Sequence, residues 1–432
     1  MERKYKDSGI EWIGMIPETW ELVATKRIFR FGKEVVGEQS EKYERLALTM
    51  NGVLKRNKDD NEGLQPEKFD GYQILKPNEI VFKLIDLANA KTSRVGLSPY
   101  LGIVSPAYII IRNKKDDNRF FYYWYMYMYY NLIFNHMGDD GVRSALSPED
   151  VLNIPIPNIS IKEQHFIADY LDKKCGEIDS LIALQEQMIE NLKAYQQSVI
   201  TEAVTKGLNP NAKLVPSGID WIEEIPEGWA VVALKSILQR RTEKNNPVKT
   251  KERLSLSIDK GVTLYAEKTT NLDRFKDDFT QYQLAYPNDI VLNSMNMIVG
   301  AVGLSNYYGC VSPVYYVVYS KSANTDIKYY SYLLNTQRIR DVYHSLGQGI
   351  YAIERGEGRV NTCRLKVSYD DFGVLRIPVP PLSEQNAIAS YLDEKSADID
   401  RLIALKQQKI ESLKDYKKSV IYEAVTGKTI IE

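Results

Sequence analysis

Two stretches of the chain, residues 178–199 and 399–420, carry apolar side chains at intervals of three or four residues. This spacing places the side chains along one face of an α-helix, so each stretch predicts a long amphipathic helix. A polar residue, Gln185 or Lys406, interrupts both stripes at the same point, so neither stripe is a strict zipper. We assign to a helix-pair or subunit interface Ile178, Leu181, Ile189, Leu192 and Tyr195 of the first stripe and Ile399, Leu402, Ile410, Leu413 and Tyr416 of the second.

The two helical stretches are copies of one another. Residues 163–205 and 384–426 align at a constant offset of 221 and are identical at 27 of 43 positions. A long solvated helix cannot bury an apolar stripe alone, and the nearest complementary stripe is that of its copy. We therefore predict that the two helices pair in antiparallel orientation within the chain and form a rigid strut.

The duplication extends to the region before each helix. The segments 8–20, 77–81 and 104–106 return as 217–229, 287–291 and 311–313. Short β-branched runs predict strands at 79–82, 102–111, 289–292 and 310–319, and longer runs predict helices at 120–134 and 327–343. The chain is therefore predicted to be α+β and pseudo-twofold symmetric, with repeated globular domains at 1–158 and 209–381 and helical spacers at 159–208 and 382–432.

Composition narrows the class of protein. The 432 residues carry a net charge of −1, so bulk charge favours neither nucleic acid nor membrane as a partner. The N-terminus lacks the apolar segment of a signal peptide, and the three cysteines have no metal-ligand spacing, which indicates a cytoplasmic location. The aromatic run at 120–134 is too short to span a bilayer. Its helical spacing favours packing in a core over base stacking.

No catalytic constellation is found in the sequence. The three histidines lie outside any metal or catalytic motif. Gly427, Lys428 and Thr429 resemble the end of a phosphate-binding loop, but Tyr422 stands where such a loop requires glycine. A duplicated scaffold without catalytic chemistry is predicted to be a binding protein, with no metal and no cofactor of its own.

A proline-rich segment precedes each helix and leads into the same two short motifs. The motifs are Glu-Gln at 163–164 and 384–385, followed by Tyr-Leu-Asp at 170–172 and 391–393. With the order of domains and helices, they make the whole chain resemble the DNA-specificity subunit of type I restriction–modification systems. Residues 158–160 depart from the usual Pro-Pro-Leu, which residues 380–382 keep.

The resemblance implies that the two globular domains are target-recognition domains, each recognising one half of a bipartite double-stranded DNA sequence. It implies that the helices set the unspecified spacer between the halves. It also implies that the helices dock two methyltransferase subunits, joined in the larger complex by endonuclease or translocase subunits. S-adenosylmethionine, ATP and Mg²⁺ would belong to those partners, and this chain would not be catalytic.

Candidate DNA-binding residues come from loops at matched positions of the two copies. Glycine gives a loop backbone freedom and arginine makes bidentate contacts to guanine, which favours 138–143 and its longer counterpart 347–364. The candidates are Arg143, Arg355, Arg359, Asn361 and Arg364 in these loops, and Lys83, Lys91, Arg94, Asn293 and Asn296 after matched strands. The alternative for any one of them is a solvated surface charge or a phosphate contact.

Two other functions remain open at this point. A self-contained DNA-modifying enzyme would bind S-adenosylmethionine as a single chain. A coiled-coil adaptor would bind its partners without selecting DNA sequences.

Overall fold

The computed structural model describes residues 3–58, 68–85, 87, 94–113, 115–137, 145–268, 278–350, 354–355, 359–360 and 364–429. The chain divides into two compact units. Unit 1 comprises Met1–Glu186 with Gln407–Glu432, and unit 2 comprises Gln187–Lys406. Two long helices, α3 (Ile161–Lys206) and α8 (Leu382–Val425), each contribute one half to each unit.

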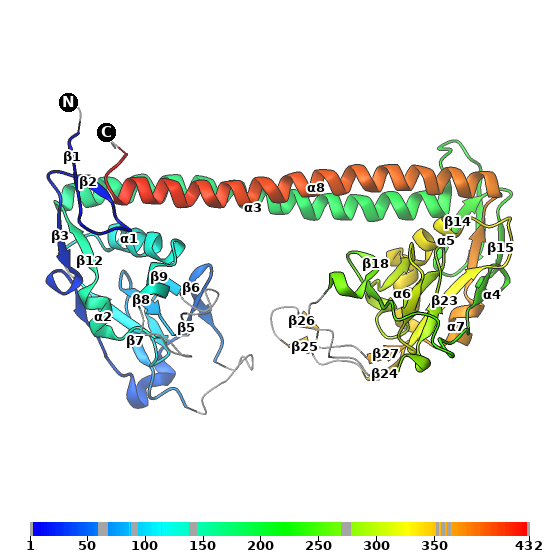
Figure 1. The fold of residues 1–432 in the computed structure, drawn as a ribbon, viewed down its shortest axis with the longest axis horizontal. Helices are drawn as coiled ribbons and strands as arrows, with labels where there is room; N and C mark the ends of the chain where they lie inside the picture. The colour runs from blue at the N-terminus through cyan, green and yellow to red at the C-terminus, as the bar shows by residue number, and fades with distance from the viewer. Residues whose placement is uncertain are drawn as a thin grey trace. The chain divides into compact units, whose positions relative to one another are not determined.

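Unit 1 is built on two four-stranded sheets, with α1 lying between them and the long helices (Figure 1). One sheet has the order β6 (Gly52–Arg56), β5 (Arg45–Thr49), β10 (Gly102–Val104) and β7 (Gln73–Leu75). The other has the order β4 (Arg30–Phe31), β11 (Ile109–Arg112), β8 (Ile80–Lys83) and β9 (Arg94–Leu97). Two ladders complete the unit, β1 (Tyr5–Asp7) with β2 (Met15–Pro17) and β3 (Glu21–Ala24) with β12 (Pro155–Asn158).

The aromatic run of the sequence forms the core helix of unit 1, as its spacing predicted. Helix α1 (Asn118–Tyr130) buries Phe120, Phe121, Trp124 and Tyr125 completely. The helix ends before residue 134 because Leu132 has a left-handed φ of 56°, and the short η3 (Ile133–His136) follows. The remaining helical turns of the unit are η1 (Thr25–Arg27), η2 (Gly37–Lys42) and α2 (Pro148–Asn153).

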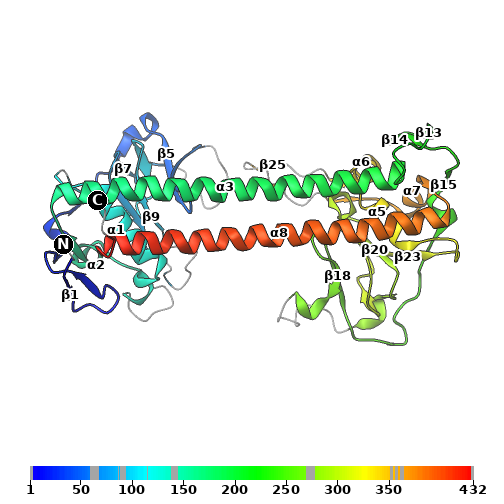
Figure 2. The same cartoon turned by 90° about the horizontal axis from the view of Figure 1, so that it is seen from above.

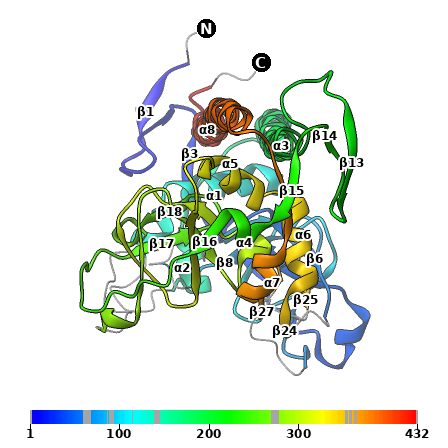
Figure 3. The ribbon, with the colours of Figure 1, turned by 90° about the vertical axis from the view of Figure 1, so that its right-hand side faces the viewer.

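Unit 2 repeats this plan with changes, and α5 (Ile327–Leu334) lies against the long helices (Figure 3). Its four-stranded sheet has the order β16 (Leu238–Arg240), β23 (Tyr315–Ser320), β20 (Ile290–Asn293) and β21 (Val302–Leu304). The two-stranded ladders are β13 (Leu214–Ile219) with β14 (Ile222–Pro226), β15 (Ala230–Ala233) with β28 (Arg376–Val379), β17 (Leu254–Ser257) with β18 (Gly261–Leu264), and β19 (Gln283–Ala285) with β22 (Gly309–Val311). The other helical segments are α4 (Leu234–Ile237), η4 (Tyr265–Glu267), η6 (Phe279–Gln281), η7 (Met297–Val299), α6 (Gln337–Leu346) and α7 (Tyr369–Val374).

Three predicted elements are divided in the structure. The single strands predicted at 102–111 and 310–319 are each two strands, because Pro106 and Pro313 occupy turns between them. The helix predicted at 327–343 is α5 followed by α6. Thr336 has extended backbone angles there, and its side chain accepts a hydrogen bond from the N–H of Ile339, so it caps a new helix.

The predicted antiparallel pairing of α3 and α8 is confirmed within each unit. In unit 2, Met188 contacts Lys406 and Gln196 contacts Asp400, so residue numbers rise along α3 while they fall along α8. In unit 1, Lys417 Nζ forms an ion pair with Asp179 at 2.7 Å. Figure 2 shows the two helices side by side.

Candidate nucleic-acid interface

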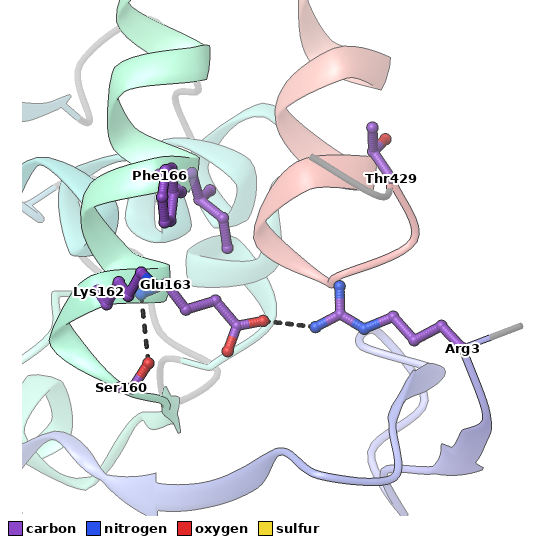
Figure 4. Close-up of a pocket in the computed structure, with 7 residues that line it drawn as sticks. Arg3, Ser160, Lys162, Glu163, Phe166 and Thr429 are labelled. Atoms are coloured by element: carbon purple, nitrogen blue, oxygen red, sulfur yellow. Dashed lines mark hydrogen bonds and ion pairs between the residues drawn. The ribbon is translucent and has the colours of Figure 1, made fainter. Parts of the chain in front are cut away.

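The start of α3 holds the first globular domain through the Glu-Gln motif. Glu163 accepts a hydrogen bond from the indole Nε1 of Trp20 at 3.0 Å and forms an ion pair with Arg3 (Figure 4). Gln164 is completely buried, and its Oε1 accepts from the backbone N–H of Asp117 at 2.8 Å. Asp117 caps α1, so this bond fixes the start of the core helix against α3.

The second copy of the motif makes the same contacts within unit 2. Glu384 accepts from the indole Nε1 of Trp229 at 2.9 Å. Gln385 is buried and accepts from the backbone N–H of Asp326, the N-cap of α5, at 2.9 Å. The repeated motif therefore has a structural role in both units.

The aspartate of the Tyr-Leu-Asp motif forms a second attachment, which we call the clamp. In unit 1, Asp172 accepts from the hydroxyl of Tyr123 at 2.8 Å and from Arg119 at 2.8 Å. Burial raises the pKa of Tyr123, so its hydroxyl remains a donor at neutral pH. The hydrogen bond that Arg119 donates to Asp117 raises the pKa of Arg119, as do those it donates to Asp169 and Asp172.

The clamp of unit 2 consists of Asp393, Tyr332 and Lys328. The hydroxyl of Tyr332 donates to Asp393 at 2.9 Å and Lys328 Nζ lies 2.6 Å from its carboxylate. The sequence displayed both aspartates in a repeated motif but did not reveal their partners. The repeat offset of 221 was the available signal, since it marked these positions as part of the shared scaffold.

The described part of the first domain places the end of the β8–β9 ladder beside the segment that follows the predicted loop 138–143. Lys83 and Arg94 are cross-strand partners at the end of the β8–β9 ladder, and both are half-buried. Ile85, just beyond β8, pairs with Ala145, two residues after the end of the predicted loop 138–143. Arg143 and Lys91 lie outside the described residues, so their contribution stays a prediction.

In the second domain, the turn that carries Asn293 and Asn296 is linked to the segment that follows the predicted loop 347–364. Asn293 ends β20 and Asn296 is exposed in the following turn. The N–H of Val367 donates to the carbonyl of Ser294 at 3.1 Å, which ties this turn to the segment after the predicted loop 347–364. The backbone there forms two short ladders, β24 (Gln348–Ile350) with β27 (Arg364–Lys366) and β25 (Glu354–Arg355) with β26 (Arg359–Val360).

The predicted loop 347–364 therefore contains paired strands, because its two ends lie close enough for backbone hydrogen bonding. Arg355 and Arg359 are cross-strand partners, and Arg364 pairs with Ile350. Asn361 lies outside the described residues. Whether these residues contact bases stays a prediction.

The residues predicted for the helix interface fall into two groups by exposure. The buried group consists of Ile178, Ile189, Ile399, Ile410 and Leu413, together with the partly buried Leu192. The exposed group has side chains that are 45–56% accessible to solvent and consists of Leu181, Tyr195, Leu402 and Tyr416. The buried side chains can pack between the paired helices. The exposed side chains are free to contact another subunit.

Neither a metal-binding group nor a reactive thiol is found among the described residues. No group of three or more histidine, cysteine or carboxylate side chains among them could hold a metal ion. Burial raises the pKa of both Cys175 and Cys310 to about 11, so both thiols are protonated at neutral pH. In the described part of the chain, no helix combines the length and the hydropathy that a membrane crossing requires.

Both halves of the chain match one known protein family. Residues 17–194 and 226–415 both match the model of the type I restriction modification DNA specificity domain. The chain belongs to this family of DNA-specificity proteins. The two matches together span most of the chain, one in each half.

Relatives of this type I specificity protein resemble it along their full length. A putative type I restriction enzyme MjaX specificity subunit from Methanocaldococcus jannaschii is 24% identical over 453 residues, which cover 96% of this chain and 95% of the relative. The type I restriction enzyme MjaVIII specificity subunit of the same organism is 24% identical over 435 residues, covering 96% and 93%.

The fold of this specificity protein also has a solved counterpart. A chain from a structure described as the basis of complex assembly and conformational transition of the type I R-M system has a TM-score of 0.64. The comparison covers 95% of this chain and 98% of that one at 14% sequence identity. At this level of identity, the similarity concerns the fold of the chain.

Proposed function

We propose that this specificity protein selects a bipartite DNA sequence for partner subunits that carry out the chemistry. Residues 1–158 and 209–381 each bind one half-site of double-stranded DNA. The paired helices set the spacer between the half-sites. The chain itself has no catalytic activity and acts in the cytoplasm.

The observation that carries this proposal is a repeated scaffold with dissimilar edges. The attachments made by Gln164 and Gln385 and the clamps made by Asp172 and Asp393 are the same in both units. The edges that hold the predicted DNA-binding residues differ, since 138–143 is short and 347–364 contains two strand ladders. Two domains that are attached to the helices in the same way, but differ where the predicted DNA-binding residues lie, are expected to recognise different base sequences.

The exposed apolar positions on the long helices support docking of two methyltransferase subunits. In unit 1, Leu181 and Tyr416 flank the ion pair between Asp179 and Lys417. In unit 2, Leu402 and Tyr195 flank the equivalent contact between Asp400 and Gln196. Leu184 and Leu405 are also exposed, so each unit presents two leucines and a tyrosine. Large apolar residues exposed at equivalent places favour two identical partners.

The cofactors follow from this division of labour. Two methyltransferase subunits bind S-adenosylmethionine and methylate the DNA that this chain selects. Endonuclease or translocase subunits use ATP and Mg²⁺. This chain holds none of these groups.

Reconstitution tests the proposal. The purified chain with S-adenosylmethionine should transfer no methyl group to DNA, whereas the chain with its methyltransferase should methylate one bipartite sequence. The double variant Leu181→Glu and Leu402→Glu places charge on both exposed faces without disturbing a buried residue. We expect it to remain folded by circular dichroism and to lose methyltransferase binding.

Two results would replace the proposal. Methyl transfer by the chain alone would show a self-contained DNA-modifying enzyme. Normal partner binding together with DNA binding that ignores sequence would show an adaptor.

A further inference from the structure

Arg340 of α6 occupies an unusual position in the second domain. Its side chain is half-buried, and its Nη2 donates a hydrogen bond to the side-chain Oδ1 of Asn335 at 2.9 Å. The Nε is buried and has no hydrogen-bond partner. Among the described residues, no ion pair joins this guanidinium to a carboxylate, although the neighbouring Asp341 attracts it electrostatically.

Two other partly buried arginines of this chain are paired with carboxylates. Arg241 donates to both carboxylate oxygens of Asp289, at 2.7 and 2.9 Å. Arg119 is held by three aspartates. These bonds raise the pKa of Arg241 and Arg119, whereas burial lowers the pKa of Arg340. A partly desolvated cation without a direct carboxylate partner is costly to keep in a folded protein, and an anionic ligand would offset that cost.

The position of Arg340 indicates which anion would reach it. The guanidinium packs on Gly300, where an added Cβ would lie 2.6 Å from Arg340 Cζ. Gly300 has a left-handed φ of 95° and closes the turn that carries Asn293 and Asn296. Helix α6 ends at Leu346, directly before the segment 347–364. Arg340 therefore packs on the turn that carries two predicted DNA-binding residues, and its helix leads into the segment 347–364.

We propose that Arg340 binds a backbone phosphate of the half-site recognised by the second domain. The inference rests on the proposed DNA-binding function. Phosphate contacts fix the position of a reader on the duplex without selecting bases. An arginine held against the turn would thus set where Asn293 and Asn296 meet the bases.

The first domain has no equivalent of this residue. Tyr123 and Tyr332 make matched clamp contacts, and the residue eight positions further is Asn131 in the first domain and Arg340 in the second. Asn131 donates its side-chain amide to the carbonyl of Tyr127. The repeat therefore gave no signal for Arg340, and the phosphate contact belongs to one half-site.

The test compares Arg340→Met with the matched variant Arg338→Met in the complex with methyltransferase. Both remove one positive charge from α6, but Arg338 is exposed and donates to the carbonyl of Trp221. Affinity is measured over a series of salt concentrations for the target and for a duplex with a scrambled second half-site. Melting temperature without DNA is measured in parallel.

We expect Arg340→Met to weaken binding to both duplexes by the same factor, on the order of tenfold at ~0.1 M salt. The slope of log affinity against log salt should shrink by about 0.9, the contribution of one phosphate. The melting temperature should fall little, because methionine keeps the contact with Gly300 and removes a partly buried charge, which offsets the lost hydrogen bond to Asn335. Arg340→Lys should recover most of the slope, and Arg338→Met should leave it unchanged.

Three results would overturn the inference. An unchanged salt slope would show that no phosphate is bound. A loss of discrimination between the two duplexes would show a base contact. A large fall in melting temperature without DNA would show that contacts within the protein already stabilise the charge. Failure of the unmodified complex to prefer its target would instead count against the proposed function.

Discussion

At the scale of residues, the sequence identified shared positions more readily than their roles. The motifs containing Gln164 and Asp172 stood out because they recur at a fixed offset. Their partners, the N–H of Asp117 and the hydroxyl of Tyr123, lie in the globular domain. No periodicity of the helix could reveal them, because the pairing depends on how the domain folds back onto α3. Arg340 carried even less signal, since its contact with Gly300 depends on how the domain folds.

Arg143 and Arg364 provide a residue-scale prediction for base recognition. They follow glycine-bearing segments at aligned positions of the two copies. If each makes a bidentate contact with a base, replacement by alanine should cost ~1–3 kcal/mol of binding free energy and relax one base position. Competition binding with duplexes altered one position at a time measures both effects.

The two variants act as controls for one another, because Arg143→Ala should affect only the first half-site and Arg364→Ala only the second. A uniform loss over all sequences with a smaller salt slope would identify phosphate contacts instead. Unchanged affinity and unchanged specificity in both variants would remove these residues as readers.

At the scale of elements, long periodic segments were predicted well and short ones were not. The helices α3 and α8 and the buried aromatic helix α1 follow directly from apolar spacing. Pro106, Pro313 and Thr336 divided elements that the apolar pattern had joined. These breaks are set by one residue's backbone preference, which a pattern averaged over ten residues does not resolve.

The helices provide an element-scale prediction about the DNA spacer. Gln196 contacts Asp400, so insertions after Ala194 in α3 and after Leu402 in α8 lie at the same level of the pair. Four added residues in each helix lengthen it by ~6 Å and keep the apolar stripes roughly in phase. We expect methylation of the same half-sites with a spacer longer by at most about two base pairs.

Two-residue insertions at the same places are the matched control. They rotate each stripe by about 200° and should disrupt the pair and abolish methylation. Methylation-aware sequencing gives the spacer directly. A spacer that stays the same in the four-residue variant would show that the helices do not set it.

At the scale of the whole molecule, a duplicated scaffold carries two independent target-recognition domains. Each unit has its own core and its own copy of the Glu-Gln attachment and of the clamp. Family membership explains why both halves match one domain model. The target bases were beyond prediction because they depend on side chains at the dissimilar edges, where the two copies provide no guide to each other.

Exchange of one reader tests this claim most directly. Residues 1–158 are replaced by the equivalent domain of a relative with a different target, and the chimera is expressed with the methyltransferase. Methylation-aware sequencing of the host then gives the new motif. We expect one half of the bipartite sequence to change while the other half and the spacer stay the same. A chimera that changes both halves, or neither, would contradict this expectation.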